Sequence, residues 1–234
     1  MLQTYTASTI VKEEIAPGVF RFVFTLPDKS IAFNAGQYLL LNVPGGYRQY
    51  SISSSPHQTD EIEIIVDIAP MGIGSKYLQA FKLGEQVTFR APLGVFMLQK
   101  TNLPKIFLAT GTGIAPIKSM VLDLAHRAFV EDYHILWGLR SHKDAYFKRE
   151  LNNLDRLNRN FHYHICYSRE DPEDTTELKG YVQDGLRILF PNNNFLLSHE
   201  FYLCGRPNTV DEVKKALRTE FTVPESHIFN EKFT

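Results

Sequence analysis

Cysteine is scarce in this sequence of 234 residues, which contains only Cys166 and Cys204. Two thiols are too few for a disulfide scaffold and are typical of the reduced thiols of cytosolic proteins. An iron–sulfur cluster is held by about four thiolates, so the sequence excludes a cluster bound by its own cysteines. We therefore expect a cytoplasmic protein whose chemistry depends on neither disulfides nor such a cluster.

Long hydrophobic runs and a surplus of one charge are also absent. No apolar run approaches the roughly 18 residues of a transmembrane helix. Residues 1–14 lack the basic start and apolar stretch of a signal peptide. The formal net charge is −1, and the eight histidines lack cysteine or carboxylate partners at metal-ligand spacing. We expect no nucleic-acid partner, no membrane insertion and no metal.

The first hundred residues read as a series of short strands. These runs are rich in β-branched and aromatic residues and are bounded by turn residues. They lie at 19–26, 37–43, 48–54 and 61–68. Only residues 74–81 favour a short helix. Several short strands with little helix between them predict a small antiparallel β-barrel.

From residue 101 onward, predicted strands alternate with predicted helices. The strands lie at 105–110, 133–139, 161–168 and 200–205, and the helices at 117–129, 143–155, 181–189 and 209–221. Such alternation is typical of a parallel sheet with helices on both faces. Because the chain exceeds the usual length of one domain, we expect two: a β-barrel over 1–100 and an α/β domain over 101–234.

A glycine-rich turn links the strand at 105–110 to the helix that follows. Gly111, Thr112 and Gly113 place backbone N–H groups at the carboxyl end of a parallel strand, where phosphates bind. Glycines also allow the backbone to approach a pyrophosphate closely. The tract departs from the G-x-G-x-x-G pattern, and an ordinary tight turn is the alternative.

Two further turns lie in the barrel half. In Arg48-Gln49-Tyr50-Ser51, the arginine and the tyrosine share one face of a strand and offer a guanidinium for a phosphate and a ring for stacking. An exposed Arg/Tyr pair is the alternative. Met71-Gly72-Ile73-Gly74-Ser75 leads into the short helix and suits a second phosphate, although alone such a loop carries little information.

Taken in order, these turns resemble motifs of the ferredoxin–NADP reductase superfamily. Tyr202-Leu203-Cys204-Gly205-Arg206-Pro207 completes the series. Within the superfamily, the chain looks most like stand-alone NAD(P)H–flavin reductases and oxygenase reductase components without an iron–sulfur domain. The resemblance implies an N-terminal flavin-binding barrel, a C-terminal pyridine-nucleotide domain and a flavin at the cleft between them.

The resemblance also implies roles for individual residues. Arg48 would bind the flavin phosphate, Tyr50 would stack on the isoalloxazine ring, and Ser51 would hydrogen-bond near flavin N5. The loop 71–75 would hold the flavin pyrophosphate. The cofactor would be FAD or FMN.

On the nucleotide side, Gly111, Thr112 and Gly113 would lie under the pyrophosphate of NADPH or NADH. Cys204 and Gly205 would face the nicotinamide, although free cysteine is commonly just a small buried residue. Glu231 would approach the flavin and relay protons, with a frayed polar tail as the alternative.

The preferred nucleotide is less strongly indicated. Ser168 and Arg169 follow a predicted strand and suit a 2′-phosphate, and Arg140 is another candidate for the adenosine end. By resemblance, Tyr181 would stack on adenine. Glu170 adds negative charge nearby, so the sequence favours NADPH only slightly.

Three functions remain open at this point. The first is a reductase that takes hydride from NAD(P)H onto bound flavin and passes electrons to a separate acceptor, such as a ferredoxin-like protein or an oxygenase. The second is a flavin reductase that uses free FMN, FAD or riboflavin as a substrate. The third is a non-catalytic subunit that keeps the fold.

Overall fold

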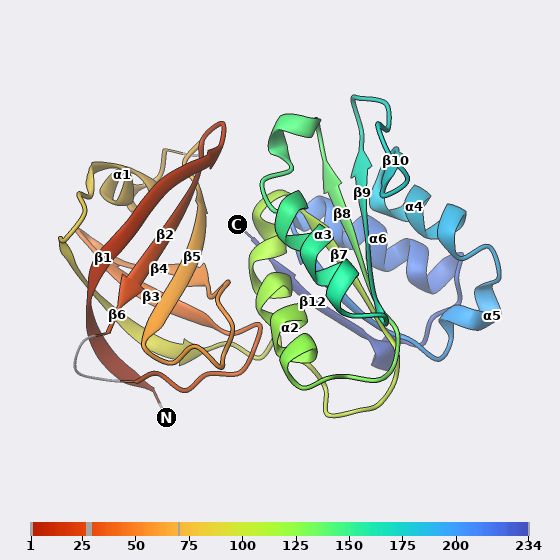
Figure 1. Cartoon of the computed structure of the whole chain (residues 1–234), viewed down its shortest axis with the longest axis horizontal. Coiled ribbons are helices and arrows are strands. Elements are labelled where there is room, and N and C mark those ends of the chain that lie inside the picture. Colours follow the sequence, from red (N-terminus) through yellow and green to blue (C-terminus); the bar gives the residue numbers. More distant parts are fainter. Residues whose placement is uncertain (1, 27–29, 70, 234) are drawn as a thin grey trace. The chain divides into compact units, whose positions relative to one another are not determined.

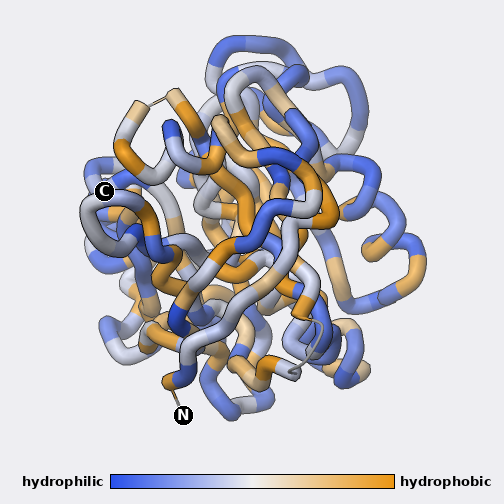
Figure 2. Tube along the Cα trace, turned by 90° about the vertical axis from the view of Figure 1, so that its left-hand side faces the viewer, coloured by the Kyte–Doolittle hydropathy of each residue, from blue (hydrophilic) through white to orange (hydrophobic). Residues whose placement is uncertain are grey.

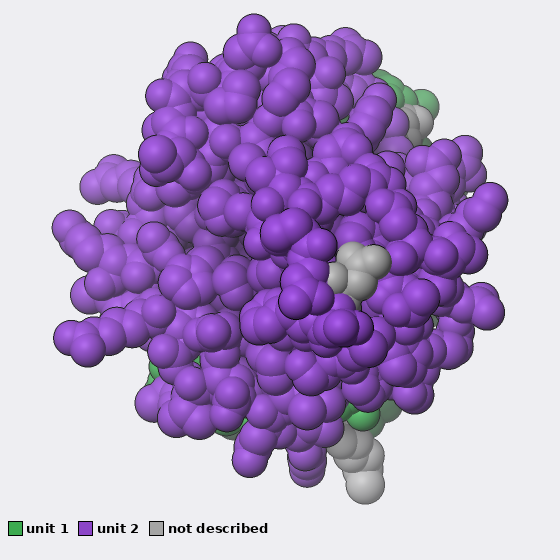
Figure 3. All heavy atoms as spheres, turned by 90° about the vertical axis from the view of Figure 1, so that its right-hand side faces the viewer, with its two compact units in different colours: residues 1–99, 115–127 green, residues 100–114, 128–234 purple. Residues whose placement is uncertain are grey.

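The structure is a computed structural model that describes residues 2–26, 30–69 and 71–233. The chain forms two compact units, which Figure 3 colours separately. Unit 1 comprises residues 1–99 and 115–127, and unit 2 comprises residues 100–114 and 128–234. Helix α2 (Ile114–His126) thus groups with the N-terminal strands. The division at residues 100 and 101 stays a prediction.

Unit 1 is built on an antiparallel sheet of six strands among the described residues (Figure 1). In spatial order they are β4 (Gly46–Ser51), β3 (Tyr38–Val43), β6 (Gln86–Leu93), β1 (Gln3–Ala16), β2 (Val19–Thr25) and β5 (Glu61–Asp67). Helix α1 (Ile73–Ala80) follows β5. Ile52 and Ile64 form a bridge between the two ends of this order, so the sheet curls towards closure. The antiparallel N-terminal architecture is as predicted.

The core of unit 1 is made by inward-facing side chains of these strands. Burial alternates at the start of β1, where Tyr5 is buried between exposed Thr4 and Thr6, and Ala7 is buried after them. Figure 2, which colours the Cα trace by hydropathy, shows hydrophobic and hydrophilic residues interspersed along the chain. On β2, Phe22 and Phe24 are fully buried, with ring centroids 6.2 Å apart. Burying such side chains stabilises the fold by about 1.5–3 kcal/mol each.

A buried ion pair fixes α2 to the strands of unit 1. The Lys118 ammonium donates to Oε1 of Glu63 at 2.8 Å. Glu63 also accepts hydrogen bonds from Nε of Arg21 at 2.6 Å and Oγ of Ser53 at 2.7 Å. Burial alone would raise the pKa of Glu63, but Lys118 and these hydrogen bonds hold it below its ordinary value. The carboxylate therefore stays charged and ties three elements together.

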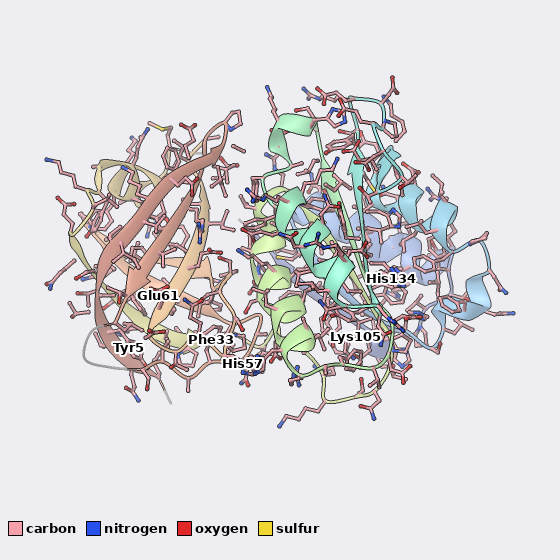
Figure 4. All side chains as sticks on the ribbon, in the orientation of Figure 1. Tyr5, Phe33, His57, Glu61, Lys105 and His134 are labelled. Atoms are coloured by element: carbon pink, nitrogen blue, oxygen red, sulfur yellow. The ribbon has the colours of Figure 1, made fainter. Side chains whose placement is uncertain are left out.

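Two more contacts hold the same helix. Oγ of Ser119 donates to the carbonyl oxygen of Ser54 at 2.7 Å in a buried position. Nε2 of His57 lies 2.8 Å from Oδ1 of Asp123; His57 is labelled in Figure 4. The helix that follows the Gly111–Gly113 turn is thus anchored at its beginning and at its end.

Unit 2 contains a sheet of six parallel strands among the described residues (Figure 1). In spatial order they are β10 (Glu177–Lys179), β9 (Phe161–Tyr167), β8 (Tyr133–Leu139), β7 (Lys105–Thr110), β11 (Glu200–Gly205) and β12 (Ile228–Lys232). The helices are α3 (Lys148–Leu157), α4 (Val182–Leu189), α5 (Asn193–Leu196) and α6 (Pro207–Thr219). The predicted parallel sheet is confirmed.

Side chains of alternating strand positions meet helices on opposite faces of this sheet. Leu108 and Leu136 pack in one cluster with residues of α4 and α6. Trp137, one position on, points the other way and contacts Tyr146 and Phe147, which precede α3. Within the described residues, the helices are all too short or too polar to cross a bilayer.

Candidate functional site

In unit 1, the first two predicted motifs come together. Gly74, at the start of α1, lies against the side chains of Arg48 and Tyr50 on β4. A Cβ atom at Gly74 would be 2.4 Å from the Tyr50 hydroxyl and 2.9 Å from Cγ of Arg48, so only glycine allows this approach. Burial raises the pKa of Tyr50 to about 12, although Arg48 lowers it, and the phenol is therefore neutral.

The other residues of the Arg48–Ser51 motif divide between the two faces of β4. Ser51 is buried at the end of the strand, where it pairs with Tyr38 of β3. Gln49 is exposed and lies on the opposite face from Arg48 and Tyr50. The strand therefore groups arginine and tyrosine but not the glutamine.

The loop 71–75 presents backbone groups at the start of α1. Gly72 is the N-cap of this helix, and no side chain among the described residues caps it. Ile73 is exposed, as is Met71, which has a left-handed backbone with φ of 49°. Oγ of Ser75 is 3.5 Å from the carbonyl oxygen of Asp67, at the limit of a hydrogen bond. The first N–H groups of the helix are thus available to an anion.

In unit 2, the Gly111–Gly113 turn is a 3-10 turn between β7 and α2. Gly111 has a left-handed backbone with φ of 53°, and its carbonyl oxygen accepts a hydrogen bond of 2.9 Å from Nε1 of Trp137. A Cβ atom at Gly113 would be 2.3 Å from the carbonyl oxygen of Cys204. The turn therefore lies directly against the end of β11, and Thr112 between the glycines is half-buried.

Beside this turn is a small pocket at the carboxyl ends of β7 and β11. It is lined by Leu108, Thr110, Val182, Leu203, Cys204, Thr209, Val210 and Val213. Oγ1 of Thr110 is buried, and the described part of the chain gives it no hydrogen-bond partner. Such an orphaned hydroxyl beside a glycine turn fits a polar ligand at this edge of the sheet.

Cys204 and Glu231 are neighbours on adjacent parallel strands. Cys204 of β11 pairs in register with Glu231 of β12. Burial, and then the Glu231 charge, raise the pKa of the Cys204 thiol well above its ordinary value, so this cysteine is a neutral thiol. The alternative of a frayed tail at Glu231 is wrong, because its backbone pairs with a central strand.

The residues predicted for the adenosine end lie at the carboxyl ends of β8 and β9. The backbone N–H of Ser168 donates to Leu139 at 3.0 Å, and that of Arg169 donates to Arg140 at 3.1 Å. The pairing thus continues past the strands and places the two arginines next to each other. Tyr181 is exposed at the N-cap of α4.

Sequence reasoning did not single out three of the residues that shape these sites. Trp137, Thr110 and His142 have no special sequence signal, because their contacts depend on the order of the strands in the sheet. Trp137 is buried under the glycine turn, and Thr110 lines the pocket. His142 contacts Glu170 near the predicted adenosine end.

Two family models match the chain. The oxidoreductase FAD-binding domain covers residues 7–98, and the oxidoreductase NAD-binding domain covers residues 107–215. The FAD-binding match contains Arg48, Tyr50 and Gly74, and the NAD-binding match contains the Gly111–Gly113 turn. An added Cβ atom would fill the space beside Gly74 in unit 1 and beside Gly113 in unit 2. These two glycine sites fit the FAD and the nicotinamide nucleotide that the two families bind.

Curated relatives include a protein of nearly equal length. Ferredoxin--NADP reductase B of Sorangium cellulosum is 30% identical over 241 residues, which cover 99% of this chain and 98% of the relative. Reductase component 2 of terephthalate 1,2-dioxygenase from Comamonas sp is 33% identical over 91% of this chain and 63% of the relative. The electron transfer component of anthranilate 1,2-dioxygenase from Acinetobacter baylyi is 28% identical over 88% and 59%. The chain thus spans about three fifths of the dioxygenase components.

Solved structures share the same fold. Amycolatopsis cytochrome P450 reductase superposes with a TM-score of 0.89 and 27% identity, over 100% of this chain and 70% of that one. The flavohem-like FAD/NAD-binding domain of nitric oxide dioxygenase from Vibrio cholerae has a TM-score of 0.85 and 24% identity, over 98% of both chains. The chain therefore belongs to the ferredoxin–NADP reductase superfamily, with an oxidoreductase FAD-binding domain followed by an oxidoreductase NAD-binding domain.

Proposed function

We propose that this oxidoreductase accepts hydride from NADPH on bound FAD and delivers the electrons to a separate protein, such as a ferredoxin or an oxygenase component. The observation that carries the proposal is the glycine-lined approach of Gly74 to Arg48 and Tyr50 in one unit and of Gly113 to Cys204 in the other. Relatives that are named electron transfer components of dioxygenases support a protein acceptor.

The flavin cradle is assigned to unit 1. FAD, when bound, would take up two electrons as hydride and release them one at a time. We assign its phosphate to the Arg48 guanidinium and the backbone N–H groups of the loop 71–75, and its ring to the neutral Tyr50 phenol. Ser51, buried at the end of the same strand, is assigned a hydrogen bond near the hydride-accepting nitrogen.

The nucleotide cradle is assigned to unit 2. The N–H groups of Gly111, Thr112 and Gly113 would bind the pyrophosphate, with the α2 N-terminus contributing favourable charge. Cys204, Gly205 and the adjacent Glu231 would lie at the nicotinamide. Because the Cys204 thiol is neutral, we assign it a packing role rather than a nucleophilic one.

We assign the acceptor to a separate protein because the two cysteines of this sequence cannot hold an iron–sulfur cluster as an onward carrier. Cys166 and Cys204 are both buried and lie on different strands, β9 and β11. They are too few to hold an iron–sulfur cluster. We therefore assign the onward transfer of electrons to an acceptor outside this chain.

NADPH is proposed as the preferred donor because Arg140 and Arg169 adjoin at the ends of β8 and β9. Two guanidinium groups suit a 2′-phosphate. Arg169→Ala should raise KM for NADPH about tenfold and leave KM for NADH unchanged. An equal rise for both nucleotides would remove this assignment.

Purification followed by anaerobic reduction tests the whole proposal. A yellow protein after gel filtration, which NADPH bleaches and which then reduces a [2Fe–2S] ferredoxin, is the expected result. A colourless protein that oxidises NADPH only with added flavin would instead favour a reductase of free flavin. Failure to oxidise either nucleotide with FAD and ferricyanide would favour a non-catalytic subunit.

A further inference from the structure

The carboxyl ends of β8 and β9 carry charges of both signs. Arg140 follows β8, and Arg169 and Glu170 follow β9. In dinucleotide-binding sheets, a carboxylate at the adenosine end binds the free ribose hydroxyls of NADH, whereas arginine accommodates the 2′-phosphate of NADPH. The orientation of the Glu170 carboxylate therefore affects whether NADH or NADPH is preferred.

His142 binds the Glu170 carboxylate with two groups. Oε2 of Glu170 accepts a hydrogen bond of 2.5 Å from the backbone nitrogen of His142 and lies 2.7 Å from its Nδ1. His142 begins the 3-10 turn His142–Asp144, which follows β8. Both contacts therefore come from the neighbouring strand end, and together they fix the direction of the carboxylate.

The His142 ring is itself held from its other side. Its Nε2 lies 3.2 Å from Oε2 of Glu177, and its centroid lies 4.3 Å from that of the Tyr167 ring. The Glu177 side chain is fully buried, and its Oε1 accepts a hydrogen bond of 2.5 Å from Nζ of Lys148. The imidazole is thus fixed by β9 and β10, and it holds Glu170 against this support.

The two arginines at the same edge are not engaged in this way. Arg140 and Arg169 are exposed, and the described residues offer neither guanidinium an ion pair or a hydrogen bond. Their main chains are joined by the 3.1 Å hydrogen bond from Arg169 to Arg140. The two guanidinium groups are therefore available to bind a ligand at these strand ends, whereas the Glu170 carboxylate is already bound by His142.

We propose that His142 is a positioning residue for nucleotide specificity: by binding Glu170 it leaves Arg140 and Arg169 to take the 2′-phosphate of NADPH. This inference rests on the proposed function, because the adenosine end of the nucleotide must lie at these strand ends. A released Glu170 carboxylate repels the 2′-phosphate and accepts hydrogen bonds from the free hydroxyls of NADH. Loss of His142 therefore changes the preference without removing the site.

Two nucleotide fragments measure this preference without turnover. Adenosine 2′,5′-bisphosphate and adenosine 5′-monophosphate differ only in the 2′-phosphate, and calorimetry gives the ratio of their Kd values. His142→Ala should reduce the preference for the bisphosphate about tenfold, because an unpaired carboxylate then faces the phosphate. Adding Glu170→Gln to His142→Ala should restore most of it, which a purely structural role of His142 does not predict.

Glu170→Gln alone is the matched control. It should change the preference by less than about twofold, because the wild-type carboxylate is already withheld. An unchanged preference in His142→Ala, or a large gain of bisphosphate affinity in Glu170→Gln alone, overturns the inference. The control replaces a partly exposed side chain, so a large gain of bisphosphate affinity in it overturns the inference even where His142→Ala does not fold.

The wild-type protein separates this inference from the proposed function. Binding of the bisphosphate more tightly than the monophosphate agrees with both. Equal binding of the two fragments overturns the role of His142 but leaves a nucleotide site. Binding of neither fragment overturns the proposed nucleotide site itself.

Discussion

The indole nitrogen of Trp137 donates a hydrogen bond of 2.9 Å to the carbonyl oxygen of Gly111. Trp137 is fully buried on β8, and Gly111 begins the turn that follows β7. This hydrogen bond holds the Gly111 carbonyl towards the sheet. Gly111 has a left-handed backbone conformation, which residues other than glycine rarely adopt. A core residue thus shapes the proposed pyrophosphate turn without reaching the ligand.

Trp137→Phe should weaken nucleotide binding about threefold to tenfold, because the Gly111 carbonyl loses its donor while most of the aromatic packing remains. Flavin affinity should not change, since the flavin residues are assigned to unit 1. Titration with NADP⁺ and with FAD measures the two affinities. Phe147→Leu, which alters packing beside Trp137 but keeps the hydrogen bond, is the control. Equal losses of nucleotide affinity in both variants would contradict a specific role for the bond.

Gly74→Ala should weaken FAD binding about tenfold or more. The new methyl group would displace the Tyr50 hydroxyl and the Arg48 side chain, which are assigned to the flavin. What is lost is their arrangement towards the flavin rather than the core. Retention of FAD on gel filtration and fluorescence titration of the apoprotein measure the effect.

Gly72→Ala is the matched control two residues earlier. A Cβ atom at Gly72 meets nothing within 4 Å, and its backbone φ of −68° suits alanine. Its FAD affinity should fall clearly less than that of Gly74→Ala, because its methyl group stands beside the same backbone N–H groups but displaces neither Arg48 nor Tyr50. If the two alanine variants bound FAD equally well, the assignment of Arg48 and Tyr50 to the flavin would be lost.

The sequence predicted β7 closely because its four apolar residues in a row, 106–109, fit a strand that is covered on both faces. It did not predict β1, a central strand whose outward positions carry Thr4, Thr6 and Ser8. The partners of β1 on β6 are distant in the chain, as in the pairing of Gln3 with Ala91. The local sequence pattern does not indicate which distant strand a segment pairs with.

The same limit applies to the candidate sites. The glycine turns could be predicted because a left-handed backbone, or a close approach between two segments of the chain, favours glycine. The pairing of Cys204 with Glu231 and the contact of His142 with Glu170 have no such sequence signal, since each joins residues that are distant in the chain. The predicted helix at 143–155 begins at Lys148 instead, because residues 142–144 form a capped 3-10 turn stabilised by Asp144.

Lys105 begins β7 and Glu200 begins β11. The two residues form a buried ion pair at the amino ends of these adjacent strands. Nζ of Lys105, labelled in Figure 4, lies 2.9 Å from Oε2 of Glu200, and both residues are at most 3% exposed. Glu200 also accepts hydrogen bonds from the hydroxyls of Thr101 and Tyr202 at 2.8 Å each. Removing the lysine would leave a buried carboxylate without its countercharge.

Lys105→Met should lower the free energy of unfolding by about 3–5 kcal/mol. The double variant Lys105→Met/Glu200→Leu should recover most of this loss, because no unpaired charge remains buried. Urea unfolding at neutral pH measures both. A double variant no more stable than the single one would show that packing around Lys105, rather than its charge, carries the stability.

His134, labelled in Figure 4, lies on β8 in the sheet of unit 2. Its ring centroid is 4.9 Å from that of His162 on β9 and 5.1 Å from that of Phe190. Burial, and then the neighbouring charges of His162, His199 and His164, lower the pKa of His134 from 6.5 to about 3. The folded protein therefore holds this imidazole neutral over a pH range in which the unfolded chain protonates it.

The sign of the stability change follows from this difference. Above pH 6.5 both states are neutral at His134 and the group has no effect on the pH dependence. As the pH falls from about 6.5 towards 3, only the unfolded chain takes up the proton, so stability is lost at up to about 1.4 kcal/mol per pH unit.

His134→Phe, which keeps a ring beside Phe190, should make the fall in unfolding free energy between pH 6.5 and pH 4.5 shallower by about 1–2 kcal/mol. Phe190→Leu should lower stability at every pH and leave the slope as it is in wild type. Urea unfolding at several pH values measures the slopes, and an unchanged slope in His134→Phe would mean that other groups cause the acid sensitivity.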